Sequence, residues 1–186
     1  QRLYYSGPMF RRERPQKGRQ RQFFQIGVEA FGFPGPDIDL EMIFITSAIF
    51  KALGFSDVVT LNINTIGVAN DRSKYINSLV EYLQKHEPDL DEDSKRRLKK
   101  NPLRILDSKN PDIQRVLSNA PLMIEQLSKN ARDEFDQICS TLTKRGIKFV
   151  INPKLVRGLD YYSKIVFEWT TTELGSQDAI CAGGRY

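Results

Sequence analysis

The spacing of apolar residues changes twice along this chain of 186 residues. Residues 1–67 and 147–186 contain short runs with the two-residue alternation that is typical of β-strands. Between them, over residues 68–146, apolar side chains recur every three or four positions, as on one face of a helix. We therefore predict an α+β fold in which a sheet with flanking helices is interrupted by an all-helical insertion.

Local signals divide the first and last segments into single elements. Residues 14–19 contain Pro15 and Gly18 and predict a turn between two extended runs. Acidic residues open a strongly apolar run at 38–53, and Gly54 follows it, which predicts a helix. Strands are expected at 4–13, 23–31, 58–64, 148–152, 160–172 and 179–182.

Composition limits the possible functions. The net charge of +5 favours anionic partners. Cys139 and Cys181 are too few for a disulfide scaffold and lack metal-site spacing, so we expect a cytoplasmic protein without a protein-only metal site. His86 is the only histidine, which argues against histidine-based catalysis. No apolar run approaches the roughly 20 residues of a membrane span, and any ATP site must differ from a Walker-type loop, which is absent.

The predicted first hairpin has two chemically different faces. Alternation places one set of side chains on the face that we expect to be buried: Phe24, Ile26, Val28 and Ala30. The opposite face would carry Phe23, Gln25, Gly27 and Glu29 from the returning strand, with Arg11 and Glu13 from the outgoing one. Such a face suits a nucleotide and a small cationic or amphoteric ligand, because a guanidinium matches phosphate oxygens and a carboxylate accepts from N–H groups. A solvated hairpin of mixed charge is the alternative.

A second candidate site lies at Leu155–Tyr162, where Arg157 precedes a glycine at the start of an apolar-aromatic strand. This arrangement places one positive charge where the backbone can approach a ligand closely. A loop arginine beside a turn, with tyrosines filling a core, explains the same residues. The glycines at 183 and 184 are similarly open between a β-bulge and a close ligand approach.

Three runs resemble the class II aminoacyl-tRNA synthetases in their bacterial histidyl-tRNA synthetase form. The run from Tyr5 to Glu29, with Gly-Pro-Met-Phe-Arg and Arg-Pro-Gln-Lys-Gly-Arg inside it, resembles motif 2. Residues 155–162 resemble the histidine-binding signature, and residues 181–186 resemble the next strand of the family. The resemblance implies a class II synthetase-type antiparallel sheet. It also implies a histidine–tRNA ligase that activates L-histidine with ATP and transfers it to the 3′ end of tRNA(His).

Motif 2 implies the ATP contacts. Arg11 would hold the α-phosphate, where charge develops during adenylate formation, and Arg19 would reach the γ-phosphate. Glu13 would lie near the adenine amino group, with Phe23 stacked on the base. Mg²⁺ is expected to accompany ATP.

The histidine-binding signature completes the implied amino-acid site. Gln25 would contact the α-amino group, Glu29 with Tyr162 would bind the imidazole, and Tyr186 would line the same pocket. Arg157 would bridge the substrate carboxylate and the α-phosphate, so that it and the motif 2 arginine are the implied catalytic residues.

The helical insertion would be the family's module that contacts the tRNA acceptor arm. Five cations lie within six residues and could contact phosphates: Lys95, Arg96, Arg97, Lys99 and Lys100. The alternative is a solvated helix face that is balanced by neighbouring acids: Asp89, Asp91, Glu92 and Asp93.

The resemblance also implies absent parts. Motif 1 would precede Gln1, and motif 3 with the anticodon-binding domain would follow Tyr186, so we expect an internal fragment of a homodimeric enzyme, inactive alone. Gln20 and Phe24 depart from the family pattern. The departure at Gln20 leaves open how this loop contacts ATP or the tRNA end. Two alternatives are a histidine-sensing regulatory paralogue of histidine biosynthesis and a non-enzymatic nucleic-acid-binding module. The retained loop arginines and insertion argue against the paralogue, and residues 155–162 argue against the binding module.

Overall fold

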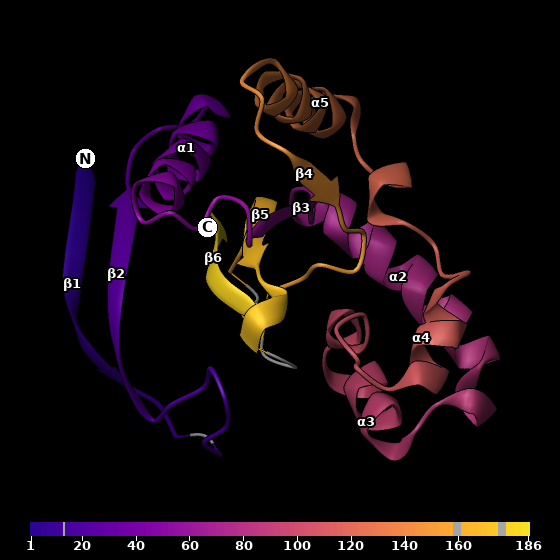
Figure 1. Ribbon diagram of the computed structural model, residues 1–186. Coiled ribbons are helices and arrows are strands. Elements are labelled where there is room, and N and C mark those ends of the chain that lie inside the picture. The colour runs from indigo at the N-terminus through magenta and orange to yellow at the C-terminus, as the bar shows by residue number, and fades with distance from the viewer. Residues whose placement is uncertain (13, 158–160, 175–177) are drawn as a thin grey trace.

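The computed structural model describes residues 1–12, 14–157, 161–174 and 178–186. Its strands form two sheets (Figure 1). The first is a two-stranded hairpin of β1 (Arg2–Phe10) and β2 (Gln22–Ala30). The second has the order β4-β3-β5-β6, with β3 at Thr60–Thr65, β4 at Phe149–Ile151, β5 at Ser163–Thr170 and β6 at Ala179–Arg185. The predicted α+β class is confirmed, and the hairpin stands as a sheet of its own.

The hairpin pairs in antiparallel register from Arg2 opposite Ala30 to Phe10 opposite Gln22. Its connecting loop ends in a tight turn, in which the Gln16 N–H donates to the Arg19 oxygen at 3.1 Å and the Arg19 N–H donates back at 2.9 Å. Gly18 has a φ of 75°, a left-handed conformation that glycine adopts without a steric penalty. The turn expected at 14–19 therefore occupies residues 16–19, the last four of that range.

The larger sheet is mixed. Strands β3–β5 and β5–β6 are antiparallel, whereas β3–β4 is parallel. Parallel neighbours need a long crossover connection, usually one that contains a helix. Here the chain runs from β3 through the whole insertion and α5 (Lys129–Lys144) before it reaches β4.

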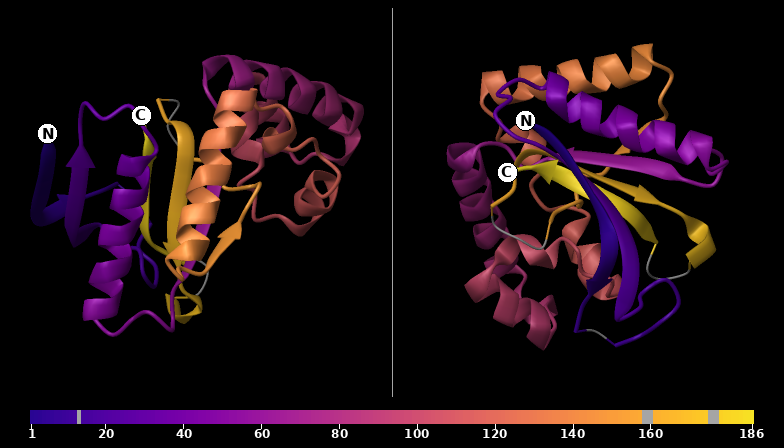
Figure 2. Two further views of the ribbon diagram at one scale, coloured as in Figure 1. Left: turned by 90° about the horizontal axis from the view of Figure 1, so that it is seen from above. Right: turned by 90° about the vertical axis from the view of Figure 1, so that its left-hand side faces the viewer.

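Helices α1 (Asp37–Ala52) and α5 lie side by side over one face of the larger sheet (Figure 2). Ile43 of α1 and Leu142 of α5 are fully buried against Leu61 and Ile63 of β3. Each such side chain contributes about 1.5–3 kcal/mol through burial. Trp169 completes this core, and its indole N–H donates to a threonine hydroxyl of α1 at 2.9 Å.

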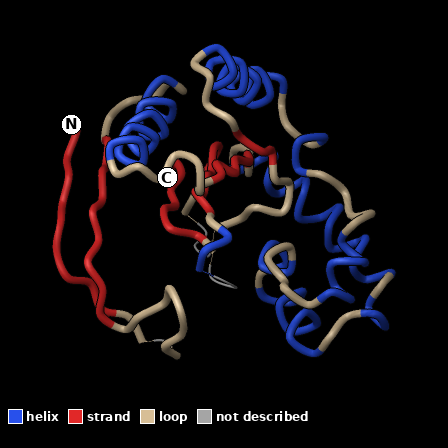
Figure 3. The backbone as a smooth tube through the Cα atoms, in the orientation of Figure 1, coloured by secondary structure: helices blue, strands red, loops and turns tan. Residues whose placement is uncertain are grey.

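The insertion is a group of helices joined by loops (Figure 3). Its buried side chains form a hydrophobic core of their own. Its elements are α2 (Ala69–Lys85), η1 (Glu87–Asp89), α3 (Glu92–Lys100), η2 (Pro102–Ile105), α4 (Pro111–Leu117) and η3 (Met123–Glu125). A further short helix, η4, spans Thr172–Leu174 near β6. Leu79, Ile105 and Ile113 are buried together within the insertion. Because α5 packs on the sheet, these contacts favour an insertion that ends before α5 rather than at residue 146.

Asp71 fastens the two ends of the insertion together. Its buried carboxylate accepts from the Ser128 N–H and hydroxyl, both at 3.1 Å. Next to it, Arg72 donates to the backbone oxygen of Tyr162 at 2.6 Å and so joins α2 to the strand region of the larger sheet. Gly67 precedes this junction with a φ of 63°, and a Cβ there would lie 2.5 Å from the Met123 side chain.

The prediction that one hairpin face is buried is wrong for two of its four residues. Phe24 is 80% exposed and Ile26 is 67% exposed, whereas Val28 and Ala30 are half-buried. Alternation assigned the residues to faces correctly, but burial requires a second layer, and the described residues place none over this part of the hairpin. Among the helices described, none is both long and apolar enough to cross a membrane.

Candidate functional site

The polar face of the hairpin begins with Arg11 and Phe23. The Arg11 guanidinium carbon lies 4.4 Å from the centre of the Phe23 ring, which confirms that these two residues share a face. Its Nε donates to the Gln20 backbone oxygen at 2.8 Å. The guanidinium is thus held over an aromatic ring at one end of β2, an arrangement that can receive a phosphate and a base.

Two other predicted ATP contacts lie in the connecting loop. Arg19 is half-buried at the end of the tight turn. Glu13 lies outside the described residues, so its predicted contact with adenine stays a prediction.

Gln25 and Glu29 follow Phe23 on the same face of β2, two and six residues further along. At about 3.3 Å per residue, Phe23 and Glu29 are roughly 20 Å apart, enough to separate a nucleotide end from an amino-acid end. The Gln25 amide donates to the Tyr5 hydroxyl at 3.0 Å. Tyr5 comes from β1, opposite Gly27, and the sequence analysis did not single it out.

Glu29 connects the hairpin to the larger sheet. The Tyr186 hydroxyl donates to a Glu29 carboxylate oxygen at 2.9 Å, and this hydrogen bond raises the pKa of Tyr186. The rings of Tyr161 and Tyr162 surround Tyr186, with centroids 5.5 and 6.3 Å away. Three of the residues predicted to bind histidine, Glu29, Tyr162 and Tyr186, therefore meet in one aromatic cluster that contains a carboxylate, whereas Gln25 contacts Tyr5 instead.

Arg157 joins the same cluster from the segment before β5. Its guanidinium carbon lies 5.5 Å from the Tyr162 ring, and Nη1 donates to Glu168 Oε1 at 2.7 Å. The two side chains are only 23% and 21% exposed. Burial raises the pKa of the Glu168 carboxyl, and the facing guanidinium offsets part of that rise. Residues 158–160 of the signature lie outside the described residues.

Arg185 anchors the end of β6 beside this cluster. Its guanidinium donates to both Asp39 oxygens at 3.0–3.2 Å, and to the backbone oxygens of Phe33 at 2.8 Å and Gly35 at 2.6 Å. The ion pair is largely buried, with 16% and 9% of the side chains exposed. These bonds hold Arg185, and with it the adjacent Tyr186, against the loop that follows the hairpin.

The glycine pair before Arg185 serves close packing and an irregular pairing. A Cβ at Gly184 would lie 2.8 Å from the Ile165 oxygen and 3.0 Å from the Tyr162 ring, and a Cβ at Gly183 would lie 2.7 Å from the Phe167 ring. The β5–β6 register also shifts between Ser163 and Val166. The pairing is therefore irregular beside Gly184, and the groups that approach the two glycines closely belong to the chain itself: the Ile165 oxygen and the rings of Tyr162 and Phe167.

Three of the five cations of α3 are paired within their own helix. Lys95 lies 3.0 Å from Glu92, Arg97 lies 2.6 Å from Asp93, and Arg96 also pairs with Asp93. Lys99 and Lys100 are exposed, and no ion pair of theirs occurs among the described residues. A contribution of this helix to tRNA binding stays a prediction.

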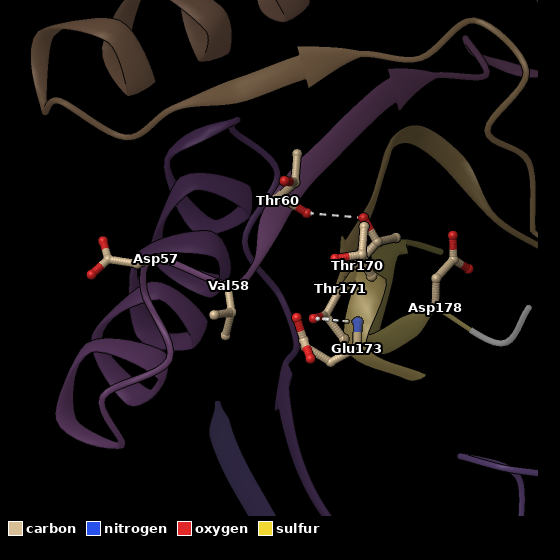
Figure 4. A pocket seen from close by; sticks show the side chains of 8 residues that line it. Asp57, Val58, Thr60, Thr170, Thr171, Glu173 and Asp178 are labelled. Carbon is tan, nitrogen blue, oxygen red and sulfur yellow. Dashed lines mark hydrogen bonds between the residues drawn. The ribbon is translucent and has the colours of Figure 1, made fainter. Parts of the chain in front are cut away.

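A cavity of about 430 Å³ lies elsewhere, lined by Thr60, Thr170, Glu173 and Asp178 among others (Figure 4). The carboxylate of Asp57 points away from the other acidic side chains there. No group of three or more histidine, cysteine or acidic side chains suited to a metal ion occurs in the described part of the chain. Burial raises the pKa of Cys139 and of Cys181 to about 11, so both thiols are protonated at neutral pH.

Comparison with known proteins agrees with this arrangement. A family model described as histidyl-tRNA synthetase matches residues 1–186. Histidine–tRNA ligases from the Lens and Philadelphia 1 strains of Legionella pneumophila are 58% identical over the whole chain. The chain spans 44% of the length of these relatives.

Solved structures resemble the fold as well. The apo histidyl-tRNA synthetase of S. aureus superimposes with a TM-score of 0.74 and 32% identity, over 100% of this chain and 43% of that one. A Bacillus halodurans C protein described as an ATP phosphoribosyltransferase regulatory subunit/histidyl-tRNA synthetase gives a TM-score of 0.58 and 25% identity, over 100% of this chain and 51% of that one. The family match over every residue, together with these likenesses, leads to one conclusion: the chain belongs to the histidyl-tRNA synthetase family.

Proposed function

We propose that the complete protein is a histidine–tRNA ligase, which forms histidyl-adenylate from ATP and L-histidine and transfers histidine to tRNA(His). The observation that carries the proposal is the hydrogen bond between Glu29 and Tyr186. It joins the polar face of the hairpin to the aromatic cluster around Arg157, so that a phosphate-binding end and an amino-acid end share one surface. Membership of the family supports the same reaction.

Adenylate formation requires a carboxylate oxygen of histidine to attack the α-phosphorus of ATP. A new P–O bond forms to that oxygen, the bond to the bridging oxygen breaks, and pyrophosphate leaves with its electron pair. The step needs alignment and neutralisation of charge rather than a strong base. Arg11, held over Phe23, and Arg157, held by Glu168, would supply that charge from two sides. Mg²⁺ would arrive with the phosphates of ATP.

Histidine would be selected by hydrogen bonds rather than by shape alone. Glu29 can accept from an imidazole N–H, while Tyr186 keeps the carboxylate oriented. The carbonyl oxygen of the Gln25 amide can accept from the α-ammonium group. A substrate without a ring N–H would leave these groups unpaired, and such losses produce large discrimination.

The insertion supports a role in tRNA contact. It folds around its own core, and it is joined to the aromatic cluster through the Arg72 bond to Tyr162. We propose that it contacts the tRNA acceptor arm, and that the complete protein works as a cytoplasmic homodimer as the family implies. Membership of the family supports these proposals, and the salt dependence of tRNA binding discussed below tests the first of them.

The decisive experiment is pyrophosphate–ATP exchange by the complete protein with each amino acid in turn. We expect exchange with histidine only. Glu29→Ala should lower kcat/KM for histidine roughly 100-fold or more, because it removes a carboxylate acceptor from the pocket. Glu41→Ala, which removes a surface carboxylate paired with Arg2, serves as the control and should leave exchange unchanged.

The alternative outcomes identify other functions. Histidine binding without any exchange would assign the protein to the regulatory paralogues, a description that one structural relative carries in part. If the protein showed no histidine binding and no exchange, the proposal would be rejected.

A further inference from the structure

We infer that Tyr5 is a specificity-determining residue of the histidine pocket: its hydroxyl orients the Gln25 amide, and its ring sets the pocket depth above Gly27. The inference rests on the proposed function, because it takes histidine as the ligand of this face. Two independent observations carry it, one steric and one from hydrogen bonding.

The steric observation concerns Gly27. A Cβ built on Gly27 would lie 2.1 Å from Tyr5 Cζ and 2.3 Å from both Cε1 and the hydroxyl oxygen. Tyr5 and Gly27 are opposite each other in the hairpin register, so the ring extends across the neighbouring strand at this glycine. Any larger residue at position 27 would have to displace the ring. The glycine therefore makes room for the tyrosine on the polar face, between Gln25 and Glu29.

The second observation fixes the direction of the Gln25 amide. Its Nε2 donates to the Tyr5 hydroxyl at 3.0 Å, which directs the amide nitrogen toward β1 and leaves the carbonyl oxygen on the other side. An ammonium group has only donors, so it needs the carbonyl oxygen and is repelled by the amide N–H₂. Without the hydroxyl, the amide would lose the partner that holds it in this position beside β1.

The exposure of Tyr5 agrees with a ligand-facing role. The side chain is 40% exposed, although its ring edge is packed on Gly27 and its hydroxyl is bonded. Tyr4, its neighbour on the opposite face of the hairpin, is 80% exposed and has no bond to the amide of Gln25 among the described residues. The pair therefore offers a matched comparison of two adjacent tyrosines.

The test uses four variants of the complete protein: Tyr5→Phe, Tyr5→Ala, Gly27→Ala and the double variant of the last two. Histidine and ATP dependence of pyrophosphate exchange are measured, and Tyr4→Phe is the control. We expect Tyr5→Phe to raise KM for histidine about 10-fold, since the loss of one oriented hydrogen bond to a charged group has that size. KM for ATP should stay within twofold, as should both constants of the control.

The double variant tests the packing. Gly27→Ala should raise KM for histidine at least 10-fold by displacing the ring, and it should have less than half of that effect, on a logarithmic scale, when Tyr5 is already alanine. Thermal unfolding of each variant separates this from a general loss of structure.

Three results would overturn the inference: KM for histidine within twofold in Tyr5→Phe, equal rises in the constants for histidine and ATP, or additive effects in the double variant. If the natural protein shows no exchange, the proposed function fails separately, and calorimetric titration with histidine replaces KM by Kd in the same comparisons. A natural protein that does not bind histidine would overturn both.

Discussion

The hairpin and the helical insertion solve the problem of burial in opposite ways. The insertion closes a core of its own, in which Leu79, Ile105 and Ile113 are almost completely buried. The hairpin buries little, and aromatic side chains such as Phe24 remain exposed on one face while polar side chains occupy the other. The part of the chain that carries the polar face is thus the part that stabilises itself least. It is held by a few bonds to its surroundings.

The largest expected effect concerns one of these bonds. Arg185→Leu would leave the Asp39 carboxylate buried without its partner, and such a break costs about 3–5 kcal/mol. We expect hydrogen–deuterium exchange of the complete protein to show lost protection in the loop after the hairpin and in α1, with the insertion unchanged. Arg2→Leu is the control, because its pair with Glu41 is exposed to solvent and should contribute little to stability. Equal effects of the two substitutions would contradict the distinction.

The reverse experiment removes a core residue of the insertion. Leu79→Ala should cost about 2–5 kcal/mol, because it leaves a cavity in a closed core. Protection from hydrogen–deuterium exchange should fall in α2, α3 and α4, while protection of the hairpin should be unchanged. Phe24→Ser, at an exposed position, should change the free energy of unfolding by no more than about 0.5 kcal/mol. A comparable loss from Phe24→Ser would mean that another part of the complete protein covers this face.

These contrasts explain what the sequence could predict. Local periodicity identified the hairpin, the register-dependent faces and the helices, because those depend on neighbours along the chain. It assigned α5 to the insertion, since helical spacing carries no information about which core a helix joins. The exposure of Ile26 was missed for the same reason, because burial depends on a second layer.

The same distinction, between neighbours along the chain and contacts between distant segments, applies to the candidate site. The residues of β2 were identified because alternation on one strand reveals their common face. Tyr5 was missed, although its position opposite Gly27 could have been found by writing out the hairpin register. Glu168 was missed because its bond to Arg157 crosses from a loop to a strand, and no spacing rule predicts such a contact.

The smallest expected effect lies on the surface of the insertion. Lys99→Ala combined with Lys100→Ala should reduce the dependence of tRNA affinity on salt by about one to two units of logarithmic slope, since each phosphate contact contributes about 0.7–0.9. Lys95→Ala combined with Arg96→Ala should have less effect, because both cations are already paired with acids of their own helix. Binding of tRNA across a range of salt concentrations tests this. An unchanged slope in both double variants would favour a solvated helix face.

The bond between Asp71 and Ser128 has a consequence for the entropy of the chain. These residues are 57 positions apart, yet the carboxylate holds them in contact. Bringing β3 and β4 together closes a loop that contains the whole insertion, and the entropic cost of closure grows with the logarithm of loop length, by about 0.6 kcal/mol per doubling. Once the insertion has folded and its base is fastened, its residues no longer count as flexible chain. For the sheet, the long excursion then acts as a short connection that contains only one helix.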